Sequence, residues 1–413
     1  MTAPETEPGE RRRWLMLALV GGGFLVMTLN WFVVSSAFTG IGAELRLDLP
    51  SLTLLISVFV AGYGICHIPG GLLATRIGMR GALVAGLALE GLATVASAVA
   101  VNELMLQLAR IAAGIGASVY AAVGVGAVSV WFRERQLALA LGLSAAGFDI
   151  GAALGTYAWT WVIQLLGWRG GIAIAGILGC LLAIATAWAF RTPPHAGRLG
   201  GVHLSRRNLA ETIGNRALWL YGAGFLGAYG GFFAAAQLIT TYADTLGYLR
   251  PGEAAVAGAL PGLAGIPGSI AGGWLSDRLA NRYGLVCIAA VAEGISLIAV
   301  TTAGSIWFSL AAFGIGFFFG LGSAVWQTLP ASGTNVSAEN IATAFGLMLT
   351  IAAIGGFVLP YVFGLISTAS GFHAGWLFLG VVSAATAGIG LFAARKPRNP
   401  EPVPLPGKTG ERR

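Results

Sequence analysis

Five ionisable side chains stand inside long apolar runs of this 413-residue sequence: Glu90, Arg110, Asp149, Glu293 and His67. Because an ionisable group is costly to place in an apolar environment, each such position is a functional hypothesis by default. A carboxyl group can bind and release a proton, an arginine attracts anions, and a histidine titrates near neutral pH. These residue types therefore indicate proton exchange and anion binding.

Glu90 and Arg110 fall on predicted neighbouring antiparallel helices, at depths that differ by about 5 Å at 1.5 Å per residue. They could form an ion pair that neutralises both charges and fixes the two helices. Alternatively, Arg110 faces a central cavity and attracts an anionic solute. The sequence leaves both interpretations open.

Asp149 stands in "AAGFDIGAALG", where glycines give the helix a thin face for close packing. It is the first prediction for a proton-coupling residue, and the alternative is a hydrogen-bonding Asp in a tight helix contact. Glu90 and Glu293 are further proton-coupling candidates; Glu293 could equally be a neutral glutamate bonded to a neighbouring helix. His67 could relay a proton or bind an anion, or simply donate to a backbone carbonyl.

Neutral polar and aromatic side chains complete the candidate solute-binding set, which already includes His67 and Arg110. Each could hydrogen-bond a small polar solute against apolar walls. Each could instead anchor a helix at the interface or join two helices. The candidates are Asn30, Tyr120, Tyr229, Gln237, Trp326 and Gln327.

The composition requires a membrane environment, because only 10% of the residues are charged and 56% are hydrophobic. Soluble domains carry roughly 25% charged residues. The sequence predicts an all-α fold with twelve spanning helices, and the first apolar run is too long for a signal peptide. The expected helices are 14–38, 51–74, 82–100, 103–128, 137–162, 170–190, 216–242, 253–275, 284–303, 305–328, 340–366 and 373–394.

Arginines gather in alternate loops, which places those loops and both termini in the cytoplasm. The net charge of +7 is thus explained by membrane topology and not by a nucleic-acid partner. We expect a multi-pass protein of the bacterial inner membrane, in contact with lipid and monomeric. No metal or cofactor is predicted, and Cys66, Cys180 and Cys287 are interpreted as small buried hydrophobes.

The chain divides into two halves of six helices. The predicted N-terminal bundle covers residues 1–190 and the C-terminal bundle covers residues 216–396. A polar, basic, Gly- and Pro-rich linker, 191–215, joins them and could contain a short amphipathic helix. The Pro-rich tail 397–413 is expected to be disordered.

The halves are repeats of each other. "GGLLATRIGMR" (70–80) recurs as "GGWLSDRLANR" (272–282), and further landmarks keep an offset of 202 to 204 residues. Two parallel six-helix repeats around a midplane site are typical of alternating-access transporters. The repeated loop is predicted to make and break contacts as the halves move, through Gly71, Arg76, Arg80, Gly273, Asp277 and Arg278.

These loop motifs resemble the conserved G-x-x-x-D-R-x-G-x-R/K motif of the major facilitator superfamily, and "RIAAGIG" (110–116) is similar to its second motif. Thr75 replaces the usual Asp of the first copy, and the second copy lacks the inner Gly. "WFRERQLALALGLSAAG" and "AAIGGFVLP" resemble the nitrate/nitrite porters and the oxalate–formate and monocarboxylate porters. However, His67 stands where nitrate porters have an Arg, and the eighth helix has no basic residue.

The resemblance implies a secondary transporter and not an enzyme. The solute we predict is a small organic anion, such as a monocarboxylate, moved by symport with protons. One alternative is a proton-coupled drug or metabolite exporter, to which the internal carboxyl groups would attract cations. A more distant alternative is a non-transporting membrane sensor.

Overall fold

The computed structural model describes residues 8–132, 136–192, 212–247, 249–279, 281–302, 304–332, 334, 336 and 341–394. Within these ranges every regular element is a helix. The predicted disordered tail 397–413 lies outside the described residues. So does most of the predicted linker, including its expected amphipathic helix.

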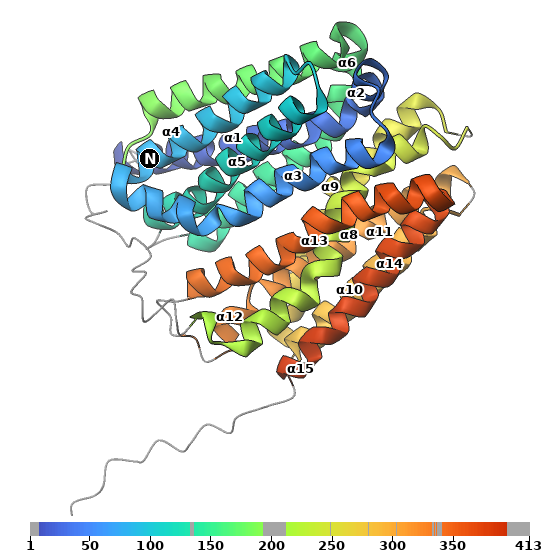
Figure 1. The fold of residues 1–413 in the computed structure, drawn as a ribbon. Helices are drawn as coiled ribbons and strands as arrows, with labels where there is room; N and C mark the ends of the chain where they lie inside the picture. Colours follow the sequence, from blue (N-terminus) through green and yellow to red (C-terminus); the bar gives the residue numbers. More distant parts are fainter. Residues whose placement is uncertain are drawn as a thin grey trace, which may run out of the picture.

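The first half folds into a bundle that occupies the upper part of Figure 1. Two of its helices contain a glycine with non-helical backbone angles, so each consists of two segments that meet at a break: Gly78 in α4 and Gly167 in α6. The elements are α1 (Pro8–Ser36), α2 (Phe38–Leu45), α3 (Leu49–Ile65), α4 (His67–Ala98), α5 (Glu103–Trp131) and α6 (Leu137–Ala189).

The second half forms the lower bundle of Figure 1. Its helices α9 and α13 carry internal prolines, which membrane helices tolerate. The elements are α8 (Arg216–Ala243), α9 (Pro251–Arg278), α10 (Arg282–Ala299), α11 (Ser305–Trp326), α12 (Leu329–Ser332), α13 (Ile341–Ser370), α14 (Phe372–Ala387), the 3-10 helix η2 (Gly388–Gly390) and α15 (Leu391–Ala394).

The predicted count of twelve spans fits these elements. Ten continuous helices in the described part of the chain are long and apolar enough to cross a membrane. One of them, Leu139–Ala189, contains the Gly167 break and therefore crosses twice. The remaining span is α3 followed by the first turns of α4.

The backbone itself carries the repeat. Gly167 has φ 72° and ψ 170°, and Gly371, 204 residues later, has φ 84° and ψ 161°. This region of backbone space is essentially open to glycine alone. In both halves the glycine lies between the fifth and sixth spans, so the same backbone conformation reverses the chain direction at the same place.

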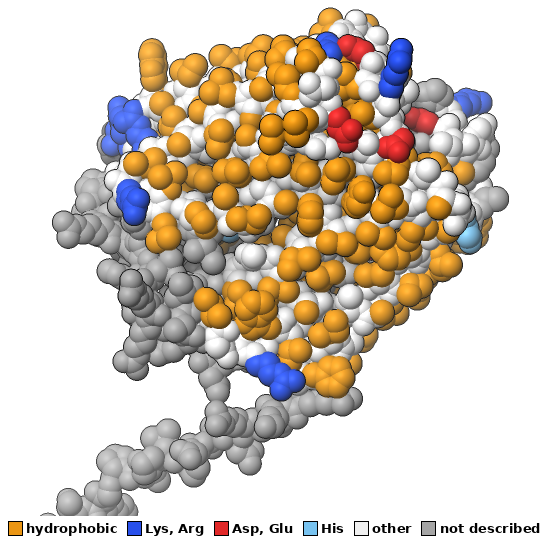
Figure 2. Space-filling view, in the orientation of Figure 1, with side chains coloured by type: hydrophobic (Ala, Val, Ile, Leu, Met, Phe, Trp, Pro, Cys, Tyr) orange, Lys and Arg blue, Asp and Glu red, His pale blue; other side chains and the backbone are white. Residues whose placement is uncertain are grey.

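An apolar belt surrounds the molecule. Figure 2 shows hydrophobic side chains over most of the visible face of both bundles, with charged side chains near its two ends. Exposed belt residues include Leu165, Trp188 and Ile270. Because Arg12, Arg76, Arg80, Arg278 and Arg282 all lie at the ends predicted to be cytoplasmic, the arrangement agrees with the positive-inside orientation.

At the outer end, a small polar cluster joins the last turn of α2 to the Gly167 turn. Arg169 contacts Glu44 at 2.8 Å and donates to the Ala98 carbonyl at 2.7 Å. Trp168 donates to the same carboxylate at 2.7 Å. The hydrogen bonds from Arg169 and Trp168 lower the pKa of Glu44, so this carboxyl group is ionised at neutral pH.

Replacing Gly167 with Ala is expected to lower the free energy of unfolding by roughly 1–3 kcal/mol, because a Cβ strains the turn. Gly142→Ala is the matched control: this helical glycine of α6 has open space around its Cβ position. Thermal unfolding of both purified variants tests the prediction. Equal melting temperatures for the two variants would contradict it.

Candidate functional site

The two bundles contact each other through two pairs of helices, and the first pair is α3 with α13. Near the outer end, a Cβ on Gly364 would collide with the Thr53 side chain. Further inward, the Cβ position of Gly64 lies 2.8 Å from the Ala353 methyl group. Thr350 also donates to the Gly64 carbonyl at 3.3 Å. This contact thus extends from the outer end of the pair to the level of Gly64.

The second pair, α6 with α9, is the repeat-related counterpart of the first. The Cβ position of Gly258 lies 2.7 Å from the Thr156 methyl group, and that of Gly265 lies 3.9 Å from Asp149 Oδ1. Asp149 is half-buried. It therefore lies where the two bundles meet, against a glycine of the opposite bundle.

A stacked aromatic pair lies between these two contacts. The rings of Trp31 on α1 and Phe233 on α8 have centroids 4.8 Å apart and an interplanar angle of 8°. The two residues are 202 positions apart, so they are equivalent in the repeat. Phe59 and Tyr63 pack on Trp31 at 4.7 and 5.0 Å. Because Trp31 is fully buried, this cluster blocks the outer side of the interface.

Towards the cytoplasm the bundles separate. The ribbons in Figure 1 converge near α2 and diverge towards α12. Cβ positions on Gly71 and Gly273, at the cytoplasmic ends of the contact helices, have no heavy atom within 4 Å. The structure is therefore closed on the outer side, with its cytoplasmic halves apart.

His67 lies just inward of the aromatic pair, with its ring centroid 4.5 Å from that of Tyr63. Cys66 interrupts the helix between α3 and α4, and His67 is the first residue after the interruption. Its Nδ1 is 2.7 Å from the Tyr63 carbonyl and 2.9 Å from Ser118 Oγ. Because a carbonyl can only accept, Nδ1 carries a proton. Nε2 then remains available to bind a proton or a ligand.

Arg110 lies behind the aromatic pair, inside the first bundle. It is 1% exposed, and its guanidinium group is 4.3 Å from the Phe59 ring centroid. It donates to the carbonyls of Asn30 at 3.4 Å and Trp31 at 3.2 Å. It forms no contact within 4 Å with Glu90: among the described residues, the one ion pair at that distance is Glu44–Arg169.

Most of the other predicted solute-binding residues lie within their own bundles. Tyr120 donates to Val20 O at 2.8 Å, Gln237 to Phe233 O at 3.0 Å and Trp326 to Tyr221 O at 2.9 Å. Asn30, Glu90 and Glu293 are fully buried. Tyr229 packs on Phe233 in the aromatic cluster, with ring centroids 4.6 Å apart. Gln327 is exposed at the cytoplasmic end of α11.

The predicted gating residues lie at the cytoplasmic ends of the helices. Arg76 and Arg80 are exposed, and the Arg278 guanidinium group stacks 3.8 Å from the Trp274 ring centroid. The side chain of Asp277 lies outside the described residues. As described above, Cβ positions on Gly71 and Gly273 have no heavy atom within 4 Å.

Sequence reasoning missed Trp31, Phe233 and Ser118. The first two could have been found from the repeat, because the offset of 202 places one aromatic residue opposite the other. Ser118 carries no comparable signal.

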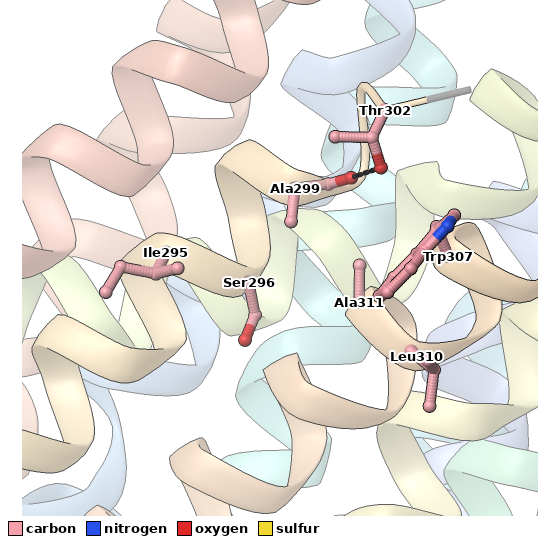
Figure 3. A pocket seen from close by; sticks show the side chains of 7 residues that line it. All are labelled: Ile295, Ser296, Ala299, Thr302, Trp307, Leu310 and Ala311. Atoms are coloured by element: carbon pink, nitrogen blue, oxygen red, sulfur yellow. Dashed lines mark hydrogen bonds between the residues drawn. The ribbon is translucent and has the colours of Figure 1, made fainter. Parts of the chain in front are cut away.

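Two pockets lie away from the bundle interface. Figure 3 shows the first, between α10 and α11, where Thr302 donates to Ala299 O at 2.7 Å. Its wall includes Ile295 and Trp307, both 64% exposed on the apolar outer surface of the bundle. The second pocket lies between α9 and α11 and includes Arg250. Both open towards the lipid side and not towards His67 or Asp149.

Two membrane-embedded bundles that are repeats of each other, joined on one side and separated on the other, define an alternating-access secondary transporter. A family comparison agrees with this class. The model of the Major Facilitator Superfamily matches residues 20–360, so the chain belongs to this family of transporters and not to a family of enzymes.

Similar proteins are also transporters. The "Probable L-galactonate transporter" of Escherichia coli K12 is 25% identical over 407 residues, which cover 91% of this chain and 88% of the relative. The "Probable sulfoacetate transporter SauU" of Cupriavidus necator is 25% identical over 404 residues, covering 89% and 91%. The structure of a bacterial homologue of the lysosomal transporter Spinster, inward-facing and unoccupied, has the same fold: TM-score 0.76, 17% identity, 95% and 98% coverage.

A disulfide across the outer contact is expected to lock this state. With Cys66, Cys180 and Cys287 replaced by Ser, the pair Thr53→Cys and Gly364→Cys should cross-link on mild oxidation, because the two side-chain positions touch. Mass spectrometry of free thiols measures the yield. Gly71→Cys with Gly346→Cys, further towards the cytoplasm along the same two contacting spans, is the control. Equal cross-linking of the two pairs would contradict an outer-closed structure.

Proposed function

We propose that this protein moves a small organic anion together with protons across the cytoplasmic membrane. Two relatives that cover about nine-tenths of the chain are named for L-galactonate and sulfoacetate. Both solutes carry a carboxylate group. The observation that carries the proposal is the placement of two half-buried ionisable residues near the contacts between the bundles: Asp149 lies against Gly265 of the opposite bundle, and His67 follows Gly64, which contacts Ala353, by three residues.

In this proposal His67 recognises the anion. Its Nδ1 proton is held by the Tyr63 carbonyl, which leaves Nε2 as the variable atom. When Nε2 is protonated, the ring is a cation and can donate a charge-assisted hydrogen bond to a carboxylate. The Trp31–Phe233 pair lies next to it on the outer side, so a solute that enters from the cytoplasm stops there.

Asp149 is the proposed proton-coupling residue. Its carboxyl group faces Gly265 across the α6–α9 contact, which must open when the outer side opens. A neutral, protonated carboxyl group tolerates the closed contact, whereas a charged one favours water. The protonation of Asp149 would therefore be linked to the state of the outer contact.

Asp149→Asn is expected to abolish uphill accumulation and leave exchange intact, because the neutral amide resembles a permanently protonated acid. The measurement uses proteoliposomes, labelled L-galactonate or sulfoacetate, and an internal pH dye. Glu103→Gln, in the first turn of α5 and away from the contacts between the bundles, is the control and should behave as the wild type. Unchanged accumulation in Asp149→Asn would show that Asp149 has no coupling role.

His67→Gln is expected to raise KM for the anion about tenfold, equivalent to ~1.4 kcal/mol, because one charge-assisted hydrogen bond is lost. The maximal exchange rate should change less. Ser269→Ala is the matched control, since Ser269 occupies the repeat-equivalent position, 202 residues later. A KM that is the same in His67→Gln and in the wild type would exclude His67 from anion recognition.

A further inference from the structure

Glu90 and Glu293 are repeat-equivalent acidic residues that the proposed transport cycle does not use. They lie 203 residues apart, within the offset of the repeat. Glu90 lies on α4 and Glu293 on α10, and both side chains are 0% exposed. In the described part of the chain, neither carboxyl group has a hydrogen-bond partner. The surroundings of the two residues nevertheless differ.

Glu90 lies near a buried cation. The Arg110 guanidinium group on α5 interacts electrostatically with the Glu90 carboxyl group. Asn30 on α1 and Thr94, one turn along α4, also have buried polar atoms without a partner among the described residues. The Asn30 amide nitrogen lies 2.9 Å from the Cβ position of Gly179, which itself touches Gly91, the residue after Glu90. Buried polar groups of three helices therefore lie in this part of the bundle.

The other described ionisable groups on the helices around Glu90 supply no positive charge close to its carboxyl group. Tyr63 on α3 and Tyr120 on α5 are the tyrosines close enough to interact with its charge. On α1, the nearest described cations, Arg12 and Arg13, lie at the cytoplasmic end of the helix. On α6, Asp149 and Arg169 lie at the bundle interface and at the outer turn. Arg110 is therefore the cation that interacts with Glu90, without an ion pair within 4 Å.

Glu293 faces small neutral residues instead. Its Oε1 lies 3.4 Å from the Cβ position of Gly231 on α8, and Ser383 on α14 lies beside the same position. The Ser383 hydroxyl group already donates to the Ala290 carbonyl at 3.1 Å. At the repeat position of Arg110, α11 carries Phe313.

Charged groups on the elements packed around Glu293 are remote. Arg282 is eleven residues away on the same helix, about 16 Å at 1.5 Å per residue. His373 is ten residues, or about 15 Å, from Ser383 on α14, and Arg216 lies at the cytoplasmic end of α8. Described α11 contains no charged residue, and the tyrosines Tyr221, Tyr229 and Tyr242 of α8 are neutral.

We propose that Glu293 is a proton-binding site that holds a neutral carboxylic acid inside the C-terminal bundle, and that the Arg110 cation, which has no counterpart near Glu293, makes Glu90 the more easily ionised of the two. An unpaired carboxylate without water or a cation is strongly unfavourable in an apolar interior, so Glu293 keeps its proton. At Glu90 the Arg110 cation offsets part of that penalty. The repeat thus places two buried glutamates at equivalent positions in unequal electrostatic surroundings.

The position of Glu293 also connects it to the moving helix. Gly231, which it touches, is two residues from Phe233, and α8 carries the aromatic closure on its other face. A change in α8 would therefore alter the surroundings of the bound proton. A role for this proton in transport rests on the proposed proton coupling. The protonation states of Glu293 and Glu90 do not depend on it.

Infrared absorption of the purified full-length protein in lipid tests the charge states directly. A protonated carboxylic acid has a carbonyl stretch that is resolved from the amide bands. We expect Glu293→Gln to remove such a band at neutral pH and Glu90→Gln to retain it. The same measurement on Asp149→Asn shows whether Asp149 contributes to the carbonyl band. A band unaffected by Glu293→Gln, or one lost in Glu90→Gln, would overturn the proposal. Neither result depends on transport.

Thermal unfolding gives an independent readout. Glu90→Gln should lower the melting temperature by several degrees, because it leaves Arg110 as an unbalanced buried cation. Glu293→Gln should leave it unchanged, since the amide replaces a neutral acid. If Glu90→Gln does not fold, the double variant Glu90→Gln with Arg110→Met should. The assignment would be contradicted if the double variant did not fold, or if Glu293→Gln lowered the melting temperature as much as Glu90→Gln.

Discussion

The structure depends on the contact between the two bundles on the outer side. Lipid tails are as apolar as the helices, so burial alone does not hold membrane helices together. Close packing must do so, and here it comes from glycines on α3, α9 and α13 together with the Trp31–Phe233 stack. Because each contact has a repeat-related partner, the closure is nearly symmetric about an axis through the interface. Such a contact can be released as a unit.

The buried ionisable residues fall into two groups, those inside a bundle and those near the contacts between the bundles. Arg110, Glu90 and Glu293 lie inside rigid bundles, where they keep their surroundings as the bundles move. Asp149 lies half-buried against the opposite bundle and His67 lies half-buried just beyond the α3–α13 contact, so we expect movement of the bundles to change their access to water. In our account, solute and proton therefore bind at the moving surface. The interior glutamates set the charge balance of each bundle.

Much of this fold could be predicted from the sequence, because charge asymmetry, hydrophobic run length and the 202–204 offset are all linear signals. Membership in the Major Facilitator Superfamily followed from the motifs around Arg76 and Arg278. The rotation of each helix could not be predicted: one residue of difference turns a side chain by about 100°. Asn30 and Tyr120 therefore looked like cavity residues but lie inside their bundle, while neighbouring Trp31 forms the closure. The interruption at Cys66, which places His67, does have a sequence signal in Pro69, since a proline removes the helical hydrogen bond to the carbonyl four residues earlier, that of Ile65.

The central claim is that the outer contact and the cytoplasmic opening alternate. Pulsed electron paramagnetic resonance measures this most directly, with spin labels at Arg46 and Glu253 on the outer side and at Arg80 and Asn281 on the cytoplasmic side. In the presence of L-galactonate or sulfoacetate, raising the pH, which deprotonates Asp149, should lengthen the outer distance and shorten the cytoplasmic one. Distances that both lengthen, or that stay fixed under every condition, would contradict the account.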